Sequence, residues 1–182
     1  AVSHKGGARA YPLQILLWHE IVNDTLAGLP LSVTYCPLCN TAIVFDRRVD
    51  GRTLDFGTSG NLRNSDLVMY DRQTESWWQQ FTGEAIVGEL TGTTLTRIPS
   101  RILSFDDYRA AFPAGQVLSR QTGHDRPYGT TPYSGYDAPG SQTLFDAANG
   151  DDRRLDAKER VVFVERAGAS VAVPFSALTQ RR

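Results

Sequence analysis

The sequence predicts a single β-rich α+β domain over residues 1–182, with a mainly antiparallel sheet forming a distorted barrel or sandwich and with two short helices. Two observations favour this class over a helical bundle. The apolar segments are short, and the 16 glycines and 9 prolines fall largely between them. A hydrophobic content of 41% and a length of 182 residues suit one soluble domain with a core of its own.

Two segments show helical patterns. The first is YPLQILLWHEIVND, residues 11–24, in which Pro12 fits a first turn and leucines recur at helical spacing. The turn-forming pair Asn23-Asp24 is expected to end this helix. The second is FDDYRAAF, residues 105–112, for which Ser104 is a suitable N-cap.

Most of the remaining apolar segments alternate and predict strands joined by tight turns. Asp50-Gly51 is a strong hairpin dipeptide, and we expect further hairpins at residues 72–74 and at Thr91-Gly92. The expected strand segments are LSVTY (31–35), TAIVFDR (41–47), RTLDFGT (52–58), SDLVMYD (65–71), ESWWQQF (75–81), EAIVGEL (84–90), TTLTRIP (93–99) and QVLS (116–119).

Charge and hydropathy exclude several classes of partner. The net charge is −1 and its signs are interspersed, so the sequence predicts no nucleic-acid partner and no binding to an anionic membrane surface. No apolar run approaches the roughly 20 residues that a transmembrane helix needs. The opening AVSHKGGARA lacks the apolar core of a signal peptide, so we expect any targeting segment to have been removed or never included.

Two regions bear on domain organisation. Residues 121–152 are rich in Gly, Pro and Tyr and predict a long loop, which in a compact domain is usually functional or disordered. Residues 164–178 repeat the pattern V-x3-G-x3-A-x-P-x3-L of residues 2–16, a candidate partial repeat. If the repeat is real, both copies should be a strand or hairpin that leads into a helix, and the chain could be a fragment of a longer protein.

The only two cysteines, Cys36 and Cys39, lie in the stretch LSVTYCPLCNTAIVFDR and supply two soft ligands. Because a structural zinc site needs four ligands and no second C-x-x-C occurs, a zinc ribbon is excluded. His19 is the expected third ligand and Met69 the fourth. This set predicts a site for copper first and zinc second.

Two other interpretations of the cysteine pair stay open. A thiol–disulfide oxidoreductase would use Cys36 as the attacking thiol and Cys39 as the resolving thiol, but the segment after the pair is strand-like rather than the long helix of a glutaredoxin-type site. A structural disulfide, or a pair of buried thiols, would close a very small loop and stabilise the fold little. In that case the protein would be a non-catalytic binding module.

The segment GTSGNLRNSD, residues 57–66, is the candidate for cofactor binding. Its small residues could present backbone N–H groups to an anion, with Asn61 and Arg63 as the binding residues. The alternative is a turn-rich connection without a ligand, since the lysine and the helix of a phosphate-binding loop are missing. We predict no particular enzymatic reaction, because nothing in the sequence shows two acid–base residues converging.

Two long stretches carry a family resemblance: ARAYPLQILLWHEIVNDTLAGLPLSVTYCPLCNTAIVFDR, and FGTSGNLRNSDLVMYDRQTESWWQQFTGEAIVGELTG. Over residues 8–136 the chain resembles the bacterial and archaeal family catalogued as domain of unknown function 3179. The resemblance implies no settled activity, but it implies an extracytoplasmic protein of the periplasm or cell envelope. Together these observations predict an extracytoplasmic metal-handling or redox protein whose partner is a metal ion or a redox partner protein.

Overall fold

A computed structural model describes residues 1–138, 140–141 and 152–179 of the chain. The chain divides into two compact units, residues 1–132 and residues 133–182, and each is described by itself. One domain over the whole chain therefore stays a prediction. The elements of the first unit are β1 (Val2–His4), β2 (Gly7–Ala10), α1 (Leu13–His19), β3 (Ile21–Leu26), β4 (Leu29–Cys36), β5 (Thr41–Asp46), β6 (Arg48–Val49), β7 (Arg52–Thr53), β8 (Phe56–Arg63), β9 (Asp66–Asp71), β10 (Trp77–Gln79), β11 (Glu84–Val87), β12 (Arg97–Ile98), α2 (Phe105–Ala111) and β13 (Gln116–Val117).

The central sheet of the first unit has the strand order β12-β5-β4-β3 and is antiparallel throughout. Its β3 strand corrects the first predicted helix, because α1 ends at His19 and residues 21–26 are extended. Three of these six residues are β-branched, which suits a strand. The turn at Ala27-Gly28, with φ of 48° and 82°, then pairs β3 with β4 along its whole length.

A second antiparallel sheet has the order β11-β10-β9-β8. Its β8 strand contains most of the segment predicted to be an anion-binding loop or a turn-rich connection. The register of β8 on β9 shifts between Thr58 and Leu62, as at a β-bulge, which accommodates the small residues. Only Asn64 and Ser65, with φ of 52° and 60°, form the turn.

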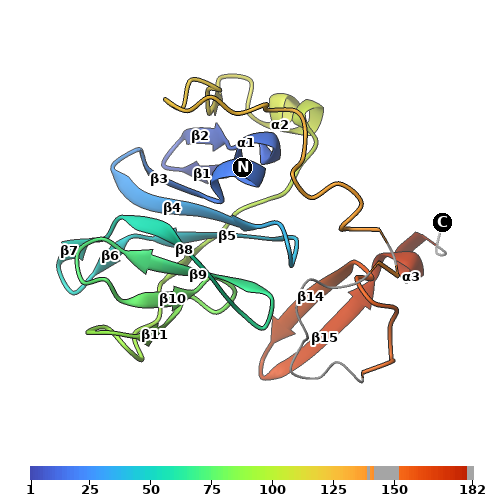
Figure 1. Cartoon of the computed structure of the whole chain (residues 1–182). Coiled ribbons are helices and arrows are strands. Elements are labelled where there is room, and N and C mark those ends of the chain that lie inside the picture. Colours follow the sequence, from blue (N-terminus) through green and yellow to red (C-terminus); the bar gives the residue numbers. More distant parts are fainter. Residues whose placement is uncertain (139, 142–151, 180–182) are drawn as a thin grey trace. The chain divides into compact units, whose positions relative to one another are not determined.

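The two four-stranded sheets pack face to face around one hydrophobic cluster (Figure 1). Trp78 lies at its centre: the side chain is fully buried, its ring meets Phe56 edge-on with centroids 5.7 Å apart, and its Nε1 donates to Asp71 Oδ2 at 2.9 Å. The neighbouring Trp77 points the other way and is 38% exposed, as expected from strand alternation. Cys36 belongs to this same cluster.

The other face of the central sheet carries a second hydrophobic cluster. Because side chains alternate along β4, Val33 and Tyr35 point to this cluster, whereas Cys36 points to the first. Hairpin β1–β2, helix α1 and helix α2 lie on this side (Figure 1). Strand β13 pairs with β2 in parallel, and the hydroxyl of Tyr108 on α2 donates to the backbone O of Gln116 on β13 at 2.7 Å.

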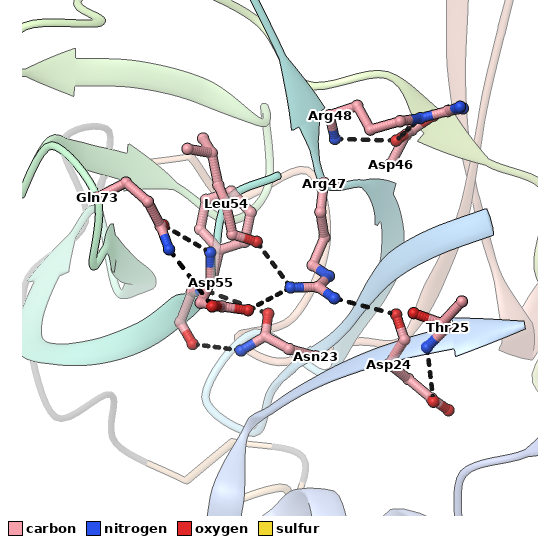
Figure 2. A network of polar contacts seen from close by, with 10 residues as sticks. Asn23, Asp24, Thr25, Asp46, Arg47, Arg48, Leu54, Asp55 and Gln73 are labelled. Atoms are coloured by element: carbon pink, nitrogen blue, oxygen red, sulfur yellow. Dashed lines mark hydrogen bonds and ion pairs between the residues drawn. The ribbon is translucent and has the colours of Figure 1, made fainter. Parts of the chain in front are cut away.

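A polar network joins the two sheets at one end (Figure 2). Arg47, only 9% exposed, follows β5 and extends its guanidinium between strands of both sheets. Asn23 on β3 exchanges two hydrogen bonds with the backbone of the first residue of β8, at 2.8 and 3.1 Å. The guanidinium donates to three acceptors: the backbone O of Leu54 at 2.9 Å, the carboxylate of Asp55, and the backbone O of Asp24 at 3.4 Å.

The second unit consists of hairpin β14 (Val161–Arg166) and β15 (Ala169–Pro174) followed by α3 (Phe175–Thr179). The candidate repeat has a structural counterpart here, since residues 2–16 and residues 164–178 both run from a hairpin into a helix. The turns also correspond: Lys5-Gly6 has φ of 44° and 80°, and Ala167-Gly168 has φ of 51° and 76°.

The predicted fold class is confirmed in its main features. The sheets are mostly antiparallel, with three short helices instead of the two expected, and within the described residues they form no closed barrel. The predicted loop 121–152 falls partly outside the described residues. None of the helices in the described ranges is long and apolar enough to cross a bilayer.

Candidate metal centre

The two cysteines lie at the turn between β4 and β5. Cys36 is the last residue of β4, opposite Thr41, and its side chain is 1% exposed. Cys39 lies in the turn itself and is exposed. Two hydrogen bonds hold the turn: Tyr35 Oη donates to Asn40 Oδ1 at 3.0 Å, and the Thr41 hydroxyl donates to the backbone O of Cys39 at 3.0 Å. Both cysteines are free thiols.

The turn between β8 and β9 brings a carboxylate to these thiols. Asp66, the first residue of β9 and only 4% exposed, accepts a hydrogen bond at Oδ1 from Cys39 Sγ at 3.3 Å. Cys36 Sγ lies 3.9 Å from the backbone O of Ser65, which precedes Asp66 in the chain. The two sulfurs and one oxygen of the carboxylate all lie within 4.8 Å of one another, so this group could hold a metal ion.

The second carboxylate oxygen of Asp66 is already engaged. Phe81 donates its backbone N–H to Asp66 Oδ2 at 2.8 Å, which orients the carboxylate and leaves Oδ1 directed at Cys39. A bond of this kind behind a ligand fixes the ligand's direction and is a usual companion of metal sites.

The electrostatics of the group are those of three acids crowded into a small space. Burial raises the pKa of Asp66, despite the N–H of Phe81. The hydrogen bond between the two thiols lowers the pKa of Cys36, and the same bond together with burial raises the pKa of Cys39. Cys36 therefore ionises before Cys39. Full ionisation would place three negative charges together, an arrangement that a bound cation would relieve.

Comparison with protein families identifies the group to which this chain belongs. The family described as "Protein of unknown function (DUF3179)" matches residues 1–182, the whole chain. The chain belongs to the DUF3179 family. Comparisons with curated proteins and with solved structures found no match. Family membership thus confirms the resemblance seen in the sequence and assigns no activity to the cysteine group.

His19, the predicted third ligand of this DUF3179 chain, has other partners in the structure, and its binding of a metal stays a prediction. His19 ends α1, and its Nε2 is hydrogen-bonded to the hydroxyl of Tyr128 at 2.5 Å. Its ring centroid lies 5.3 Å from that of His124. The group that gathers at the cysteines contains Asp66 and does not include His19. Burial and the nearby His124 and Arg126 lower the pKa of His19.

Met69, the predicted fourth ligand, is fully buried on β9 in the same hydrophobic cluster as Cys36. It pairs with Thr58 on β8 and with Trp78 on β10. As predicted from alternation, Leu67 and Met69 share the inward face of β9. Asp66 does not share the alternating positions of Leu67 and Met69 on β9. It contacts Cys39 from the start of that strand.

The residues predicted to bind an anion lie on β8. Arg63 pairs with Asp66 across the β8–β9 hairpin, and its Nη1 donates to Gln79 Oε1 at 3.1 Å. The backbone N–H of Asn61 donates to the Ser59 hydroxyl at 3.0 Å. Ligand binding by Arg63 and Asn61 stays a prediction, but pairing with β9 takes up part of the backbone that an anion-binding loop would present.

Sequence reasoning missed Asp66. The available signal was a carboxylate at the start of a buried strand, in RNSDLVMY. Nothing in that pattern says that the β8–β9 turn lies beside the β4–β5 turn, because the proximity depends on how the two sheets stack.

Proposed function

We propose that this DUF3179 protein binds zinc through Cys36, Cys39 and Asp66 and leaves one coordination position open. The observation that carries the proposal is the convergence of two thiols and one oriented carboxylate within 4.8 Å, from turns that are far apart in the sequence. Zinc commonly takes cysteine sulfur at about 2.3 Å and carboxylate oxygen at 2.0–2.2 Å, so tetrahedral ligands lie about 3.6 Å apart. The contact of 3.3 Å between Cys39 Sγ and Asp66 Oδ1 is already close to that spacing.

The donor set favours zinc over the copper predicted from the sequence. Copper(I) prefers soft sulfur donors such as thiolate and thioether, whereas zinc also accepts carboxylate oxygen. With Asp66 in place of His19, the set becomes two sulfurs and one oxygen. Three protein ligands with an open fourth position are typical of zinc that exchanges ligands or activates a bound molecule.

The test is a competition titration of the reduced protein with zinc and a chromophoric chelator, combined with measured metal content. We expect about one zinc per chain for the wild type. Asp66→Asn should weaken binding at least about tenfold, because it removes an anionic ligand. The matched control Asp46→Asn changes a carboxylate that pairs with Arg48 and should bind as the wild type does. Unchanged affinity in Asp66→Asn would contradict the proposal.

Two further variants separate this ligand set from the one predicted from the sequence. His19→Gln and Met69→Leu should retain zinc, whereas Cys39→Ser should lose it. If His19→Gln loses the ion and Asp66→Asn keeps it, the third ligand is the histidine. Copper(I) binding that needs both cysteines and is indifferent to Asp66→Asn would support the copper alternative.

The contact between the two free thiols keeps thiol–disulfide exchange as a second candidate, although the geometry favours it less. The proposed attacking thiol, Cys36, is buried, and the accessible thiol, Cys39, has a raised pKa. A thiolate is the attacking species, so this combination opposes reaction with a large substrate. Turnover of a model disulfide that Cys36→Ser abolishes would support this candidate. The extracytoplasmic location expected from the family likewise stays a proposal.

A further inference from the structure

The other face of the central sheet contains a cavity of about 460 Å³ that the proposed metal centre does not use. Its floor is formed by β4 and β5 through Val33, Ala42 and Val44, and its wall by Leu16 of α1 and Tyr108 of α2. This volume lies within the range of small-molecule sites, about 300–1,000 Å³. Cys36 points away from it, on the opposite face of β4.

The lining is mainly apolar, and its polar side chains are those of Gln14, Ser100, Arg101 and Ser104 besides two tyrosines. Two tyrosines contribute to it, but their hydroxyls are satisfied elsewhere: Tyr11 donates to Asp24 Oδ2 at 2.7 Å and Tyr108 to the backbone O of Gln116 at 2.7 Å. The rings therefore line the cavity as apolar surfaces. A hydrocarbon chain would fit this interior without leaving buried polar groups unpaired.

Large apolar side chains are also exposed around the opening. Eight large hydrophobic residues of the first unit are exposed, and five of them line this one cavity. The five are Leu13, Ile102, Leu103, Phe105 and Val117. Such concentration of exposed apolar surface marks a binding site more often than scattered single residues do.

One cationic side chain among the lining residues selects the kind of ligand. Arg101 is exposed, and within the described residues its guanidinium makes no hydrogen bond or ion pair. Its backbone is fixed, because Arg101 N donates to the O of Ala1 at 3.0 Å and Ser100 bridges to Val2. A guanidinium beside an apolar cavity complements a carboxylate at the end of an apolar chain.

We propose that this cavity binds a single-chain amphiphile with an anionic head, namely a long-chain fatty carboxylate. The chain occupies the space between the central sheet and the two helices, and the carboxylate meets Arg101 at the opening. This site is distinct from the metal centre: Cys36 faces the first hydrophobic cluster, whereas Val33 and Val44 line the cavity on the opposite face of the central sheet.

The experiment is calorimetric titration of the full chain with dodecanoate below its micellar concentration, beside dodecanol as the uncharged analogue. We expect saturable binding of one dodecanoate per chain. Arg101→Gln should weaken dodecanoate about tenfold and leave dodecanol unchanged, because only the carboxylate contacts the guanidinium. Equal effects on both ligands, or no effect on either, would overturn the assignment of the head group.

A second pair of variants tests the cavity itself. Ala42→Leu fills the floor and should weaken both ligands at least about tenfold. Ile43→Leu changes the adjacent residue, which points to the opposite face, and should bind as the wild type does. Unfolding curves of both variants establish that they are folded. Absence of saturable binding to the wild type, or unchanged binding to folded Ala42→Leu, would overturn the proposal. So would a dimer in sedimentation that excludes dodecanoate, since a second copy would then be the occupant.

Discussion

The two faces of the central sheet use the same strands for different purposes. Toward the second sheet, β4 and β5 present Thr34, Cys36 and Phe45 to a filled core that is held by polar contacts at both ends. Toward the helices, the alternate residues Val33 and Val44 line a cavity. Because successive side chains of a strand point to opposite faces, one strand can contribute to a packed core on one face and line an apolar cavity on the other. Substitutions of adjacent residues can therefore test one face at a time.

The largest expected effect comes from the filled face. Trp78→Ala removes a fully buried side chain together with its contacts to Phe56 and Asp71, and should lower the free energy of unfolding by about 3–5 kcal/mol. Leu16→Ala on the other face should cost about 2 kcal/mol, near the lower end for such changes, because Leu16 already borders a cavity. Urea denaturation measures both. Equal losses would mean that the two faces are equally well packed.

The polar junction of Figure 2 gives the next effect. Arg47→Met keeps much of the apolar stem but leaves the acceptors at Leu54 and Asp55 without their donor. We expect a loss of about 1–3 kcal/mol in the free energy of unfolding. Arg48→Met is the matched control, because Arg48 is exposed and pairs only locally with Asp46. A loss as large in the control would refute the special role of the junction.

On the cavity face, Tyr108→Phe removes one hydroxyl and leaves the ring in place. The backbone O of Gln116 then loses a donor at 2.7 Å, and the free energy of unfolding should fall by about 1 kcal/mol. The apolar lining is unchanged, so dodecanoate binding should be retained. Stability is read from thermal unfolding and binding from calorimetry. Lost binding with stability unchanged would show that the hydroxyl serves the ligand.

The smallest effect concerns pH and the ion pair that ties the hairpin β1–β2 to β3. Burial opposes ionisation of Asp24, but bonds from Arg9, Tyr11 and the N–H of Thr25 outweigh it and lower the pKa of Asp24 below its ordinary value. The unfolded chain then binds more protons, so this stabilisation is present above the ordinary pKa and is lost as pH falls through the lowered one. Asp24→Asn should remove this part of the acid dependence, which contributes less than about 1 kcal/mol to the free energy of unfolding. Unfolding curves between pH 2 and 7 would show it, and an unchanged slope would contradict it.

Local structure was predictable where pattern and turn chemistry agree. The Asp50-Gly51 turn joins β6 to β7, Ser104 caps α2 through the N–H of Asp107 at 3.1 Å, and the strands around Cys36 lie where alternation places them. The first helix was predicted to be longer than it is, because the apolar residues 21 and 22 fit a helical pattern as well as a strand. Pairing with β4 decides between them, and that pairing is not local.

In the candidate site, too, the local part was predictable from the sequence and the non-local part was not. Spacing alone brings Cys36 and Cys39 together, since only two residues separate them. His19 was chosen for its chemistry, but α1 lies on the other side of the central sheet and its histidine bonds Tyr128. Asp66 reaches the thiols through the stacking of two hairpins, which no window of sequence encodes. The cavity was equally hidden, because its lining comes from segments spread over more than 100 residues.

The origin of the three candidate ligands in two different hairpins has a kinetic consequence. Cys39 and Asp66 are 27 residues apart and belong to turns of opposing layers. An ion bound to all three would link the two sheets, so the sheets could not separate while it is bound. The ion would therefore slow unfolding more than it speeds folding.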